Sequence, residues 1–467
     1  MSTANVDVAI IGGGTAGMAA YREVRKVTDS IALIEGGPFG TTCARVGCMP
    51  SKLLIAPAEA RHRLEALPAF GIESDSGQGD GAKVMHRVRS ERDRFVGFVH
   101  ESIDGFDQQH IIRAYAEFED PHTLRLRAPN PDIGPAPEIQ RLRAERIIIA
   151  TGSRPHVPEN LRAAADRLIV NDDVFFWQDL PQSVAVFGTG VIGLELGQAL
   201  HRLGVRVRLY GRGGRIAGLT DPQVRESAGR IFAAELPYSR DTHDVRVERS
   251  ARGVEVQWRD GGGDPQLEEF DYLIAAAGRI SNTDKLAIEN SGLELDARGV
   301  PVFDPQLMQA GDSHIFIAGD ANAVLPLLHE AADEGRLAGE NAAHYPDSYK
   351  RVRRTPLAIV FSDPQVAFAG LRFDQLEASG HDYAVGEVSF EDQGRSRVML
   401  VNRGLLRVYG EQQTGLLLGA EMVGPANEHL AHLLAWAIQA RMTVGQVLEM
   451  PFYHPVIEEG LRTALRN

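Results

Sequence analysis

The sequence predicts an α/β protein built from two similar βαβ units and a smaller α+β domain at the carboxyl end. Twice in the chain an apolar strand runs into a Gly-x-Gly-x-x-Gly segment that opens a helix, and a second strand follows. The pattern changes after about residue 350, where short strands replace the βαβ order. With 467 residues the chain is also too long for one core, so about three domains are expected.

The first unit starts with an apolar strand at 8–11 and reaches Gly12, Gly14 and Gly17 before its helix. In such a turn the first glycine permits the tight bend, the second lets a pyrophosphate approach the backbone, and the third lets helix and strand pack closely. The free N–H groups at the helix start then favour the phosphates. Glu35 ends the second strand, where an acid can bind ribose hydroxyls. The unit is therefore predicted to be a Rossmann-like dinucleotide-binding domain.

The second unit repeats this order, from the strand at 184–187 through Gly188, Gly190 and Gly193. One such motif would be a weak signal, because glycine triplets arise by chance. Two motifs, each framed by strand, helix and strand, predict two dinucleotide-binding domains.

The second unit lacks an acid at the end of its second strand, and Arg212 and Arg215 follow there instead. An arginine at this point can hold a 2′-phosphate, which favours NADP(H) over NAD(H). The alternative is that both arginines only face solvent.

The rest of the chain is predicted to mix helices with antiparallel strands. Helix is expected over about 50–104, a polar stretch near 120–145, a strand at 146–150 that runs into Thr151-Gly152, antiparallel strands over 243–278, a strand that ends at Asp320, a helix from about Leu327 and another over 427–440.

Composition and charge exclude several classes of protein. The formal charge of −14 argues against nucleic acid or an anionic membrane as the main partner. The amino end shows no basic segment with an apolar core and a cleavage site, and no apolar run approaches the length of a membrane span. We therefore expect a cytoplasmic protein without a membrane span, and no metal site is predicted.

The chain has only two cysteines, Cys43 and Cys48. A structural disulfide is disfavoured in a large cytosolic domain, and closing so short a loop gains little chain entropy, so a redox role is favoured. Residues five apart in a regular helix are separated by about 7.5 Å along the axis, whereas a disulfide needs Cα atoms within about 7 Å. If the two are to bond, the segment must be distorted, with Gly47 and Pro50 as the residues that allow it. A strained, accessible disulfide is the labile and catalytic kind.

The run from Cys43 to Cys48, followed by Met49-Pro-Ser-Lys52, resembles the family of dihydrolipoamide dehydrogenase, glutathione reductase and mercuric reductase. The resemblance covers essentially the whole chain. It implies FAD and NAD(P) as cofactors, with Cys43 as the thiol that exchanges with substrate and Cys48 as the thiolate that contacts the flavin. It also implies that Lys52 lies near flavin N5, with Glu195 as its ion-pair partner.

The resemblance assigns further residues and three domains. Asp320 would hold the flavin ribityl chain, and Arg279 would lie near the pyrophosphate. The FAD-binding set is Gly12, Gly14, Gly17, Glu35, Thr42, Thr151, Gly152, Arg279 and Asp320, and the NAD(P) set is Gly188, Gly190, Gly193, Arg212 and Arg215. The expected domains are an FAD-binding domain at 1–155 and 280–345, an NAD(P)-binding domain at 156–279, and a carboxyl-terminal α+β dimerisation domain at 346–467.

A catalytic base is predicted near the carboxyl end. The chemistry needs a group that takes a proton from a dithiol, and a histidine oriented by a carboxylate suits this near neutral pH. The family's His-Pro-x-x-x-Glu pattern places these roles on His454 and Glu459. In the family this histidine reaches the disulfide of the other subunit, so the resemblance implies a homodimer with two composite sites.

The substrate is less specified than the reaction. Mercuric reductases carry an extra cysteine pair near the carboxyl end and lack the histidine, so that class is disfavoured. Glutathione reductases favour NADPH, which agrees with Arg212, and they bind carboxylate-bearing tripeptides through arginines. Arg22 could serve as such an arginine, although a place on a helix surface is favoured for it.

The tail RTALRN and the helix that contains His329 look more like dihydrolipoamide dehydrogenases, which however normally carry an acid at the position of Gly211 and Asn at that of Arg45. We therefore predict a dihydrolipoamide dehydrogenase that acts on free dihydrolipoamide or a separate lipoyl-bearing protein. The alternatives are an NADPH-dependent reductase of another low-molecular-weight disulfide, and an electron-transfer flavoprotein without disulfide turnover.

Overall fold

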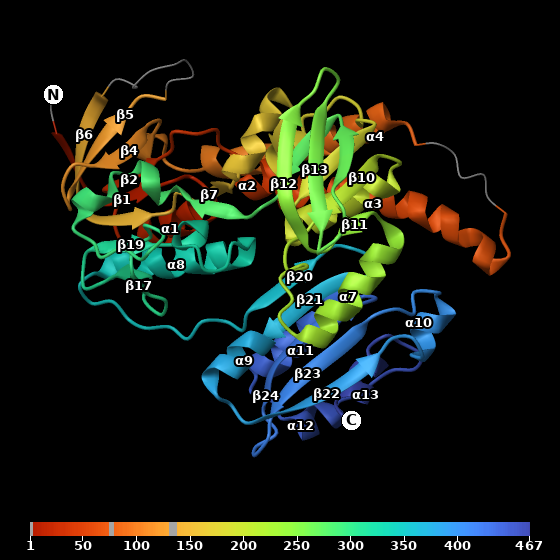
Figure 1. Cartoon of the computed structure of the whole chain (residues 1–467). Helices are drawn as coiled ribbons and strands as arrows, with labels where there is room; N and C mark the ends of the chain where they lie inside the picture. The colour runs from red at the N-terminus through yellow and green to blue at the C-terminus, as the bar shows by residue number, and fades with distance from the viewer. Residues whose placement is uncertain (1–2, 74–78, 130–137) are drawn as a thin grey trace. The chain divides into compact units, whose positions relative to one another are not determined.

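The computed structural model describes residues 3–73, 79–129 and 138–467. These residues form two compact units (Figure 1). Unit 1 contains residues 1–50, 89–155 and 279–353, and unit 2 contains residues 51–88, 156–278 and 354–467. Residues 130–137 of the predicted polar stretch lie outside the described part.

Unit 1 is built on a sheet whose central strands are parallel. The strand order is β17-β18-β19-β6-β1-β2-β3, with β1 (Thr3–Ile11), β2 (Ile31–Ile34), β6 (Glu138–Ile149) and β19 (Ile315–Ile317) at its centre. β1 pairs in parallel with both β2 and β6. The last four residues of β1, the last three of β6 and all of β2 are buried on both faces, and each is a continuous apolar run.

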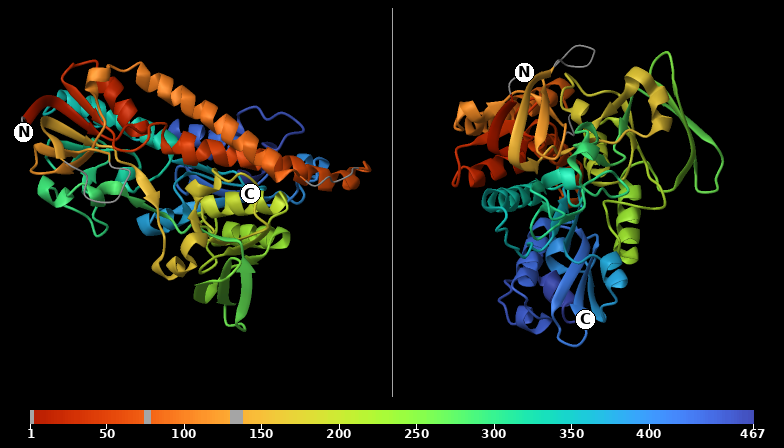
Figure 2. Two further views of the ribbon diagram at one scale, coloured as in Figure 1. Left: turned by 90° about the horizontal axis from the view of Figure 1, so that it is seen from above. Right: turned by 90° about the vertical axis from the view of Figure 1, so that its left-hand side faces the viewer.

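Two helices, α1 (Thr15–Val24) and α8 (Leu328–His344), lie side by side on this sheet (Figures 1 and 2). Their backbones are very close. A Cβ atom added at Gly335 would stand 2.2 Å from the Ala16 carbonyl oxygen, and one at Gly339 would stand 2.6 Å from that of Ala20. Any side chain at these glycines would therefore force the helices apart, and the crossing fixes α8 against the helix of the first glycine turn.

The other elements of unit 1 surround this layer. They are α2 (Thr42–Val46), β3 (Ile111–Ile112), β4 (Tyr115–Phe118), β5 (Thr123–Arg127), β7 (Ser153–Pro155), β16 (Arg279–Ser281), β17 (Phe303–Asp304) and β18 (Gln309–Ala310). Helices α3 (Cys48–Ala66) and α4 (Gly81–Asp104) each have residues in both units. The short 3-10 helices are η1 (Leu67–Phe70), η2 (Gln108–His110), η3 (Glu159–Arg167), η4 (Asn282–Lys285), η5 (Ile288–Ser291) and η6 (Gly319–Asn322).

Unit 2 contains the second βαβ unit on a parallel sheet of order β11-β10-β9-β15-β8. Its strands are β8 (Leu168–Val170), β9 (Ser183–Phe187), β10 (Arg206–Tyr210), β11 (Tyr238–Ser239) and β15 (Tyr272–Ala275), and its helices are α5 (Asn171–Val174), α6 (Val191–Arg202) and α7 (Pro222–Glu235). The antiparallel strands predicted for 243–278 are β12 (Thr242–Arg249), β13 (Val254–Asp260) and β14 (Gln266–Phe270).

The carboxyl-terminal part of unit 2 is an antiparallel sheet of order β20-β21-β24-β23-β22. Its strands are β20 (Leu357–Val360), β21 (Gln365–Gly370), β22 (Tyr383–Ser389), β23 (Leu405–Glu411) and β24 (Leu417–Gly424). Helix α11 (Asn427–Gln439) packs on this sheet and buries Leu430 and Leu434 against it. The smaller helices are α9 (Phe373–Ser379), α10 (Gly394–Val398), α12 (Val444–Leu448) and α13 (Glu459–Ala464).

The predicted α/β architecture with two βαβ units and a carboxyl-terminal α+β part is confirmed. One element is longer than predicted: the strand expected at 146–150 begins at Glu138. Its amino half pairs with β1 on one side and β5 on the other, and Arg141 forms an ion pair with Glu119 across the hairpin at 2.8 Å. These partners explain why so polar a segment forms a strand.

Two fully buried carboxylates join α7 to the carboxyl-terminal sheet. Asp221 caps α7 through the backbone N–H groups of Gln223 and Val224, and its second oxygen accepts hydrogen bonds from Arg407 at 2.7 Å and Tyr409 at 2.9 Å. Glu421 of β24 accepts hydrogen bonds from the backbone N–H groups of Thr220, Asp221 and Phe373 and from the Thr220 hydroxyl. All oxygens of both carboxylates are therefore satisfied, as burial of a charge requires.

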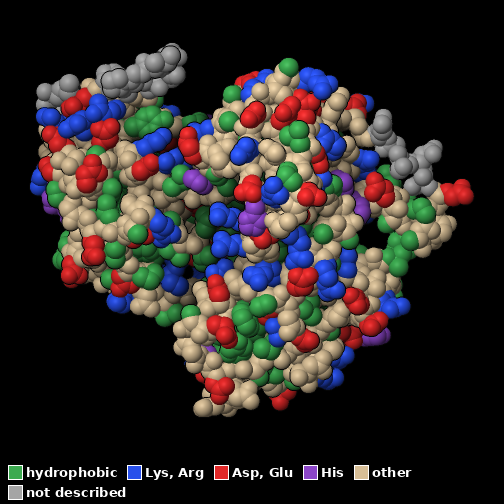
Figure 3. All heavy atoms as spheres, in the orientation of Figure 1, with side chains coloured by type: hydrophobic (Ala, Val, Ile, Leu, Met, Phe, Trp, Pro, Cys, Tyr) green, Lys and Arg blue, Asp and Glu red, His purple; other side chains and the backbone are tan. Residues whose placement is uncertain are grey.

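Acidic side chains lie among basic ones on the face shown in Figure 3. Among the helices within residues 3–73, 79–129 and 138–467, none is both long enough and apolar enough to cross a membrane.

Replacement of Glu421 by Gln should destabilise unit 2. The amide offers one acceptor oxygen where the carboxylate offers two, so about two buried donors lose their partner, and we expect a loss of about 2–4 kcal/mol of unfolding free energy. This loss is measured by denaturant unfolding of Glu421→Gln. The control is Glu255→Gln, at an exposed position of β13. Equal stability of the two variants would show that Glu421 contributes no more than a surface carboxylate.

Candidate functional site

The first glycine of each predicted nucleotide turn adopts a backbone conformation that favours glycine. Gly12 has a φ of +111° and Gly188 a φ of +114°. A Cβ atom would stand 2.3 Å from the Ala150 carbonyl oxygen at Gly12 and 2.2 Å from that of Ala276 at Gly188. Both the conformation and the close approach exclude a side chain.

The second and third glycines differ in their surroundings. A Cβ atom at Gly17 would stand 1.8 Å from the Gly12 carbonyl oxygen, so helix and turn are in backbone contact there, whereas Gly14 has no atom within 4 Å of such a position. Gly190 and Gly193 repeat these two environments, open at Gly190 and blocked at Gly193. Gly14 and Gly190 are the N-caps of α1 and α6, where no side chain caps the helix. The N–H groups at both helix starts are thus available to phosphates.

Glu35 follows β2, beside the first glycine turn. Its two carboxylate oxygens accept hydrogen bonds from the backbone N–H groups of Gly13 at 2.8 Å and Gly37 at 2.6 Å. The carboxylate is therefore held in place at the strand end, next to the turn.

Arg279 and Asp320 meet at Ser153 in unit 1. The Ser153 hydroxyl donates to Asp320 Oδ2 at 2.8 Å, and Arg279 donates to the same hydroxyl at 2.7 Å and to the Ser153 carbonyl oxygen at 2.8 Å. Gly152 just before it has a φ of +69°, and the Thr151 hydroxyl is buried without a hydrogen-bond partner among the described residues. Ser153 was not predicted as a site residue, although its place in the Thr151-Gly152-Ser153 turn was a signal for it.

The cysteine segment is a helix broken once. α2 ends at Val46 and α3 begins at Cys48, so the break falls at Gly47, where a Cβ atom would stand 3.0 Å from the Thr42 carbonyl oxygen and 3.1 Å from Cys43 Cα. Pro50 lies in the first turn of α3, where no intrahelical N–H bond is lost. Thr42 is the first residue of α2.

Both cysteines are in the reduced thiol form, Cys43 half-buried and Cys48 exposed. A hydrogen bond to Cys48 and burial raise the pKa of the Cys43 thiol well above its usual range.

Lys52 follows one helical turn after Cys48 and pairs with Glu195 of α6. The distances from Lys52 Nζ to the two carboxylate oxygens are 2.8 and 2.9 Å, and Glu195 is only 4% exposed. Phe361 completes this set: its backbone N–H donates to Glu195 at 2.9 Å, and Lys52 Nζ lies 4.6 Å from the centre of its ring. Phe361 was missed from the sequence, where no motif marks it.

Arg212 and Arg215 are exposed on the loop after β10. No ion pair of either is found within the part of the chain that the structure describes. The loop is held by its backbone instead: Gly213 N–H donates to Asp241 at 2.7 Å, and the Thr189 hydroxyl donates to the Arg215 carbonyl oxygen at 2.6 Å. Asp221, the first acid after β10, caps α7 and is buried in the joint described above. The loop thus offers two guanidinium groups to an anion.

His454 and Glu459 form a pair near the carboxyl end. His454 Nδ1 lies 3.0 Å from Glu459 Oε2, and the histidine side chain is 81% exposed. Burial would raise the pKa of Glu459, but hydrogen bonds from His454 and the backbone of Val456, with the charge of Arg462, hold this pKa below its usual range. Arg462, 3.0 Å from the other oxygen, was not predicted. With Nδ1 facing the carboxylate, Nε2 is the nitrogen left to exchange protons.

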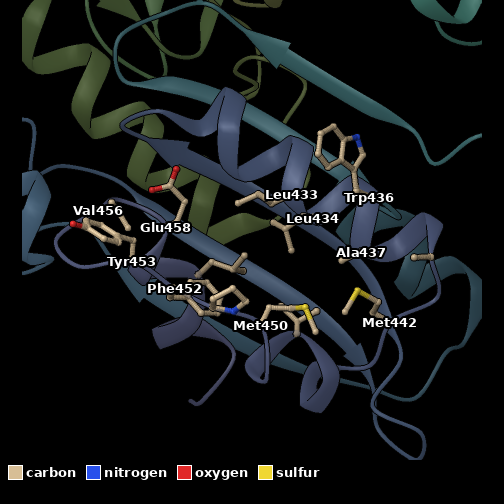
Figure 4. A pocket seen from close by; sticks show the side chains of 14 residues that line it. Leu433, Leu434, Trp436, Ala437, Met442, Met450, Phe452, Tyr453, Val456 and Glu458 are labelled. Carbon is tan, nitrogen blue, oxygen red and sulfur yellow. The ribbon is translucent and has the colours of Figure 1, made fainter.

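An apolar pocket of about 580 Å³ lies beside this pair in the carboxyl-terminal part (Figure 4). Leu433 and Trp436 of α11 line one side, and Met450, Phe452 and Tyr453 line the other. Trp436 and Tyr453 are largely exposed in the single chain. So large an exposed apolar patch is typical of an interaction surface.

Comparison with known proteins agrees with this arrangement. Residues 6–335 match the family model for pyridine nucleotide-disulphide oxidoreductase, and residues 357–465 match the model for the dimerisation domain of the same enzymes. Two dinucleotide-binding folds and the Cys43–Cys48 pair define an FAD-dependent disulfide oxidoreductase. The chain belongs to the pyridine nucleotide-disulphide oxidoreductase family.

Individual relatives differ in their substrates. The chain is 28% identical to dihydrolipoyl dehydrogenase of Geobacillus stearothermophilus, over 96% of this chain and 93% of that protein. It is 30% identical to mercuric reductase of Streptomyces lividans, over 99% and 96%. Among solved structures, the Cu(II) complex of the HOCl-induced flavoprotein disulfide reductase RclA from Escherichia coli matches with a TM-score of 0.80 at 22% identity, over 100% of this chain and 99% of that one. The last likeness shows the fold alone.

The residues of unit 1 fit FAD, which this family binds. The start of α1 is uncapped, the space beside Gly14 is open, and the buried Thr151 hydroxyl lacks a partner among the described residues. Each is what a bound dinucleotide would satisfy.

The contrast between the glycines of the second turn can be tested. Gly190→Ala should fold normally and weaken NAD(P)H binding by about 10-fold or more, because its methyl group enters the space where pyrophosphate approaches. Gly193→Ala should instead fold poorly, because its methyl group meets the Gly188 carbonyl oxygen. Circular dichroism and NAD(P)H titration of both variants measure this. Normal folding of Gly193→Ala would contradict the assignment of the close contact.

Proposed function

We propose that this enzyme is a dihydrolipoamide dehydrogenase, which oxidises a dihydrolipoyl dithiol and reduces NAD(P)+. The observation that carries the proposal is the His454–Glu459 pair in a chain that also holds the Cys43–Cys48 pair. A base oriented by a carboxylate serves to deprotonate a thiol. An electron carrier that turns over no disulfide needs neither pair.

The proposed FAD-binding residues lie in unit 1. They are Gly12, Gly14, Gly17, Glu35, Thr42, Thr151, Gly152, Arg279 and Asp320. When bound, FAD supplies the two-electron transfer between the cysteine pair and the nicotinamide. Lys52 and Glu195 are proposed to supply a fixed cation on the flavin side of the cysteines, because the buried carboxylate and the Phe361 ring restrain the ammonium group.

Disulfide exchange is proposed to proceed at Cys43. A thiolate of the substrate attacks Sγ of Cys43 in the oxidised pair, the Cys43–Cys48 bond breaks, and Cys48 leaves as a thiolate. His454 Nε2 takes the proton of the attacking thiol, while Glu459 stabilises the imidazolium. The second substrate thiol then displaces Cys43 from the mixed disulfide: Cys43 takes the proton that His454 held, and His454 takes the proton of this second thiol. The substrate leaves as a disulfide and the protein holds the reduced pair.

The matched dimerisation domain supports a homodimer. We propose that the apolar pocket of Figure 4 is part of the surface that the second copy covers, since a free surface seldom exposes so many large apolar groups. His454 follows directly after Tyr453 of this surface, so the base of one copy would serve the cysteines of the other.

A second candidate is an NADPH-dependent reductase of another low-molecular-weight disulfide. It is favoured by Arg212 and Arg215, which are exposed and suited to a 2′-phosphate. The mercuric reductase activity of some relatives is not proposed, because the chain has no cysteines besides Cys43 and Cys48.

Turnover of dihydrolipoamide tests the first candidate. We expect rapid reduction of NAD+ or NADP+ by the wild type, and a loss of about 100- to 10,000-fold in kcat for His454→Gln, because the base is removed. The matched control is His381→Gln, an exposed histidine of the same carboxyl-terminal part, which should keep its activity. No turnover by a flavin-loaded wild type would overturn the proposed substrate and favour the NADPH-dependent alternative.

Arg212→Ala tests the nucleotide preference. The KM for NADP(H) should rise about 10- to 100-fold while that for NAD(H) changes less than about twofold, because only the former carries the 2′-phosphate. Steady-state kinetics with each nucleotide measure this, with Arg246→Ala on an exposed position of β12 as control. An equal rise in the KM for both nucleotides would show that Arg212 does not bind the 2′-phosphate.

A further inference from the structure

A buried carboxylate spans the turn that carries Asp320. The turn is η6, and Glu334 of α8 meets it at both ends: Oε2 accepts hydrogen bonds from the Gly319 backbone N–H at 2.8 Å and from Asn322 Nδ2 at 2.7 Å. Glu334 is only 4% exposed. One oxygen atom thus holds the first and last residues of the turn, with Asp320 between them.

The second oxygen of Glu334 is held by Arg353. Arg353 Nη2 lies 3.0 Å from Glu334 Oε1 and 2.5 Å from a carboxylate oxygen of Glu330, which is also buried. Arg353 is the last residue of unit 1 before the carboxyl-terminal part of the chain. Two buried carboxylates that share one guanidinium are costly to desolvate, so stability alone is a poor reason for this cluster.

Other contacts also hold the turn: the Ser281 hydroxyl donates to the Ala321 carbonyl oxygen at 2.6 Å, and Arg298 donates to the carbonyl oxygen of Ala323 at 3.1 Å. Gly319 has a φ of +70°, and a Cβ atom there would stand 2.9 Å from Ala16 Cβ and 3.3 Å from Ala331 Cβ. The turn therefore packs closely against α1 and α8. The Asp320 side chain accepts a hydrogen bond from the Ser153 hydroxyl, while Glu334 accepts one from the Gly319 backbone N–H of the same turn.

We propose that Glu334, backed by Arg353, is the positioning residue of the flavin site: it holds the Gly319–Asn322 turn so that Asp320 faces the ribityl chain of FAD. The inference rests on the FAD site of the proposed function but is independent of the dithiol substrate. Glu334 touches no cofactor and acts through the turn. Its removal lets the turn shift and weakens FAD binding.

If Glu334 positions the turn, its protonation state should make FAD binding depend on pH. Burial raises the pKa of Glu334 to about 7, against the opposing effects of Arg353 and the two donors of the turn. The charged and titratable groups around it are Arg353, Glu330 and Asp320, with His329 at 3.8 Å from Glu330. All three hydrogen-bond partners of Glu334 are donors, so a proton on its carboxyl group competes with at least one of them. FAD affinity should therefore fall as the pH drops from 8 to 6.

Stability has the opposite pH dependence. The pKa of Glu334 in the folded protein lies above its ordinary value, so the stability from its bound proton is present below about pH 4.5 and is lost as the pH rises through 7. A residue that only stabilised the fold would make the apoprotein less stable at pH 8 without raising its FAD affinity. The pH dependence of FAD affinity and that of apoprotein stability thus distinguish a positioning role of Glu334 from a purely stabilising one.

The test compares Glu334→Gln with Glu340→Gln. Glu340 lies on the same helix and pairs with Arg351 of the same connecting segment at 2.7 Å, but contacts no residue of the turn among the described hydrogen bonds and ion pairs. The dissociation constant of the apoprotein for FAD is measured at pH 6, 7 and 8 by quenching of flavin fluorescence, with melting temperatures alongside. At pH 8 we expect Glu334→Gln to bind FAD about 10- to 100-fold more weakly than wild type, without the pH dependence, and Glu340→Gln to stay within about twofold.

Glu334→Gln that binds FAD as tightly as Glu340→Gln at pH 8 would overturn the proposal. If Glu334→Gln does not fold, Asn322→Ala tests the contact between Glu334 and the turn. This change removes the Asn322 donor and leaves the Glu334 carboxylate paired with Arg353. We expect about 5- to 10-fold weaker FAD binding, and unchanged binding would overturn the proposal. A wild type that binds no FAD would overturn both this inference and the proposed function, whereas one that binds FAD without oxidising dihydrolipoamide overturns only the substrate.

Discussion

Both nucleotide turns depend on contact between the third glycine and the carbonyl oxygen of the first. Cβ atoms at Gly17 and Gly193 would stand 1.8 and 1.9 Å from those oxygens, a distance that no side chain tolerates. The contact brings the start of each helix to the end of its strand and leaves the helix N–H groups uncapped beside open space. The Thr151 turn and the Asp320 turn follow strands of the same sheet, so unit 1 gathers its polar groups where the parallel strands end.

Carboxylates hold several turns and loops of this protein, and Glu334, Glu421 and Glu195 among them are buried. Glu35 holds the first glycine turn, Glu334 the Asp320 turn, and Glu421 the loop before α7, each by accepting backbone N–H groups. Glu195 does the same for Phe361 while it pairs with Lys52. A carboxylate fits this task because its two oxygens accept several donors at once, and charge-assisted bonds are stronger than neutral ones.

The sequence predicted the elements that depend on local pattern. The two glycine turns, the parallel strands and the cysteine segment were predicted because each requires specific residues at fixed spacing. Ser153, Phe361 and Arg462 were missed because their roles come from contacts between distant segments, which single residues without a motif do not reveal. The amino half of β6 was treated as a polar stretch because its pairing with β5 and its ion pairs are formed only in the folded sheet. Asp221 is the first acid after β10, and only the structure shows it as a helix cap buried against Arg407 and Tyr409.

The buried contacts of Asp221 and Glu421, which join α7 to the carboxyl-terminal sheet, limit how unit 2 can move. A hinge needs a segment whose contacts are easily broken. Here α7 could leave the carboxyl-terminal sheet only if Asp221 lost Arg407 and Tyr409 and Glu421 lost its donors in the loop before α7. The two halves of unit 2 should therefore move as one rigid body. In the loop after β10, Gly213 and Gly214 both have positive φ angles, and their N–H groups donate to Asp241 at 2.7 Å and to the Arg240 carbonyl oxygen at 3.1 Å. The loop that carries Arg212 and Arg215 is thus tied through its backbone to the segment at 240–241 of the same unit, while both arginine side chains stay exposed.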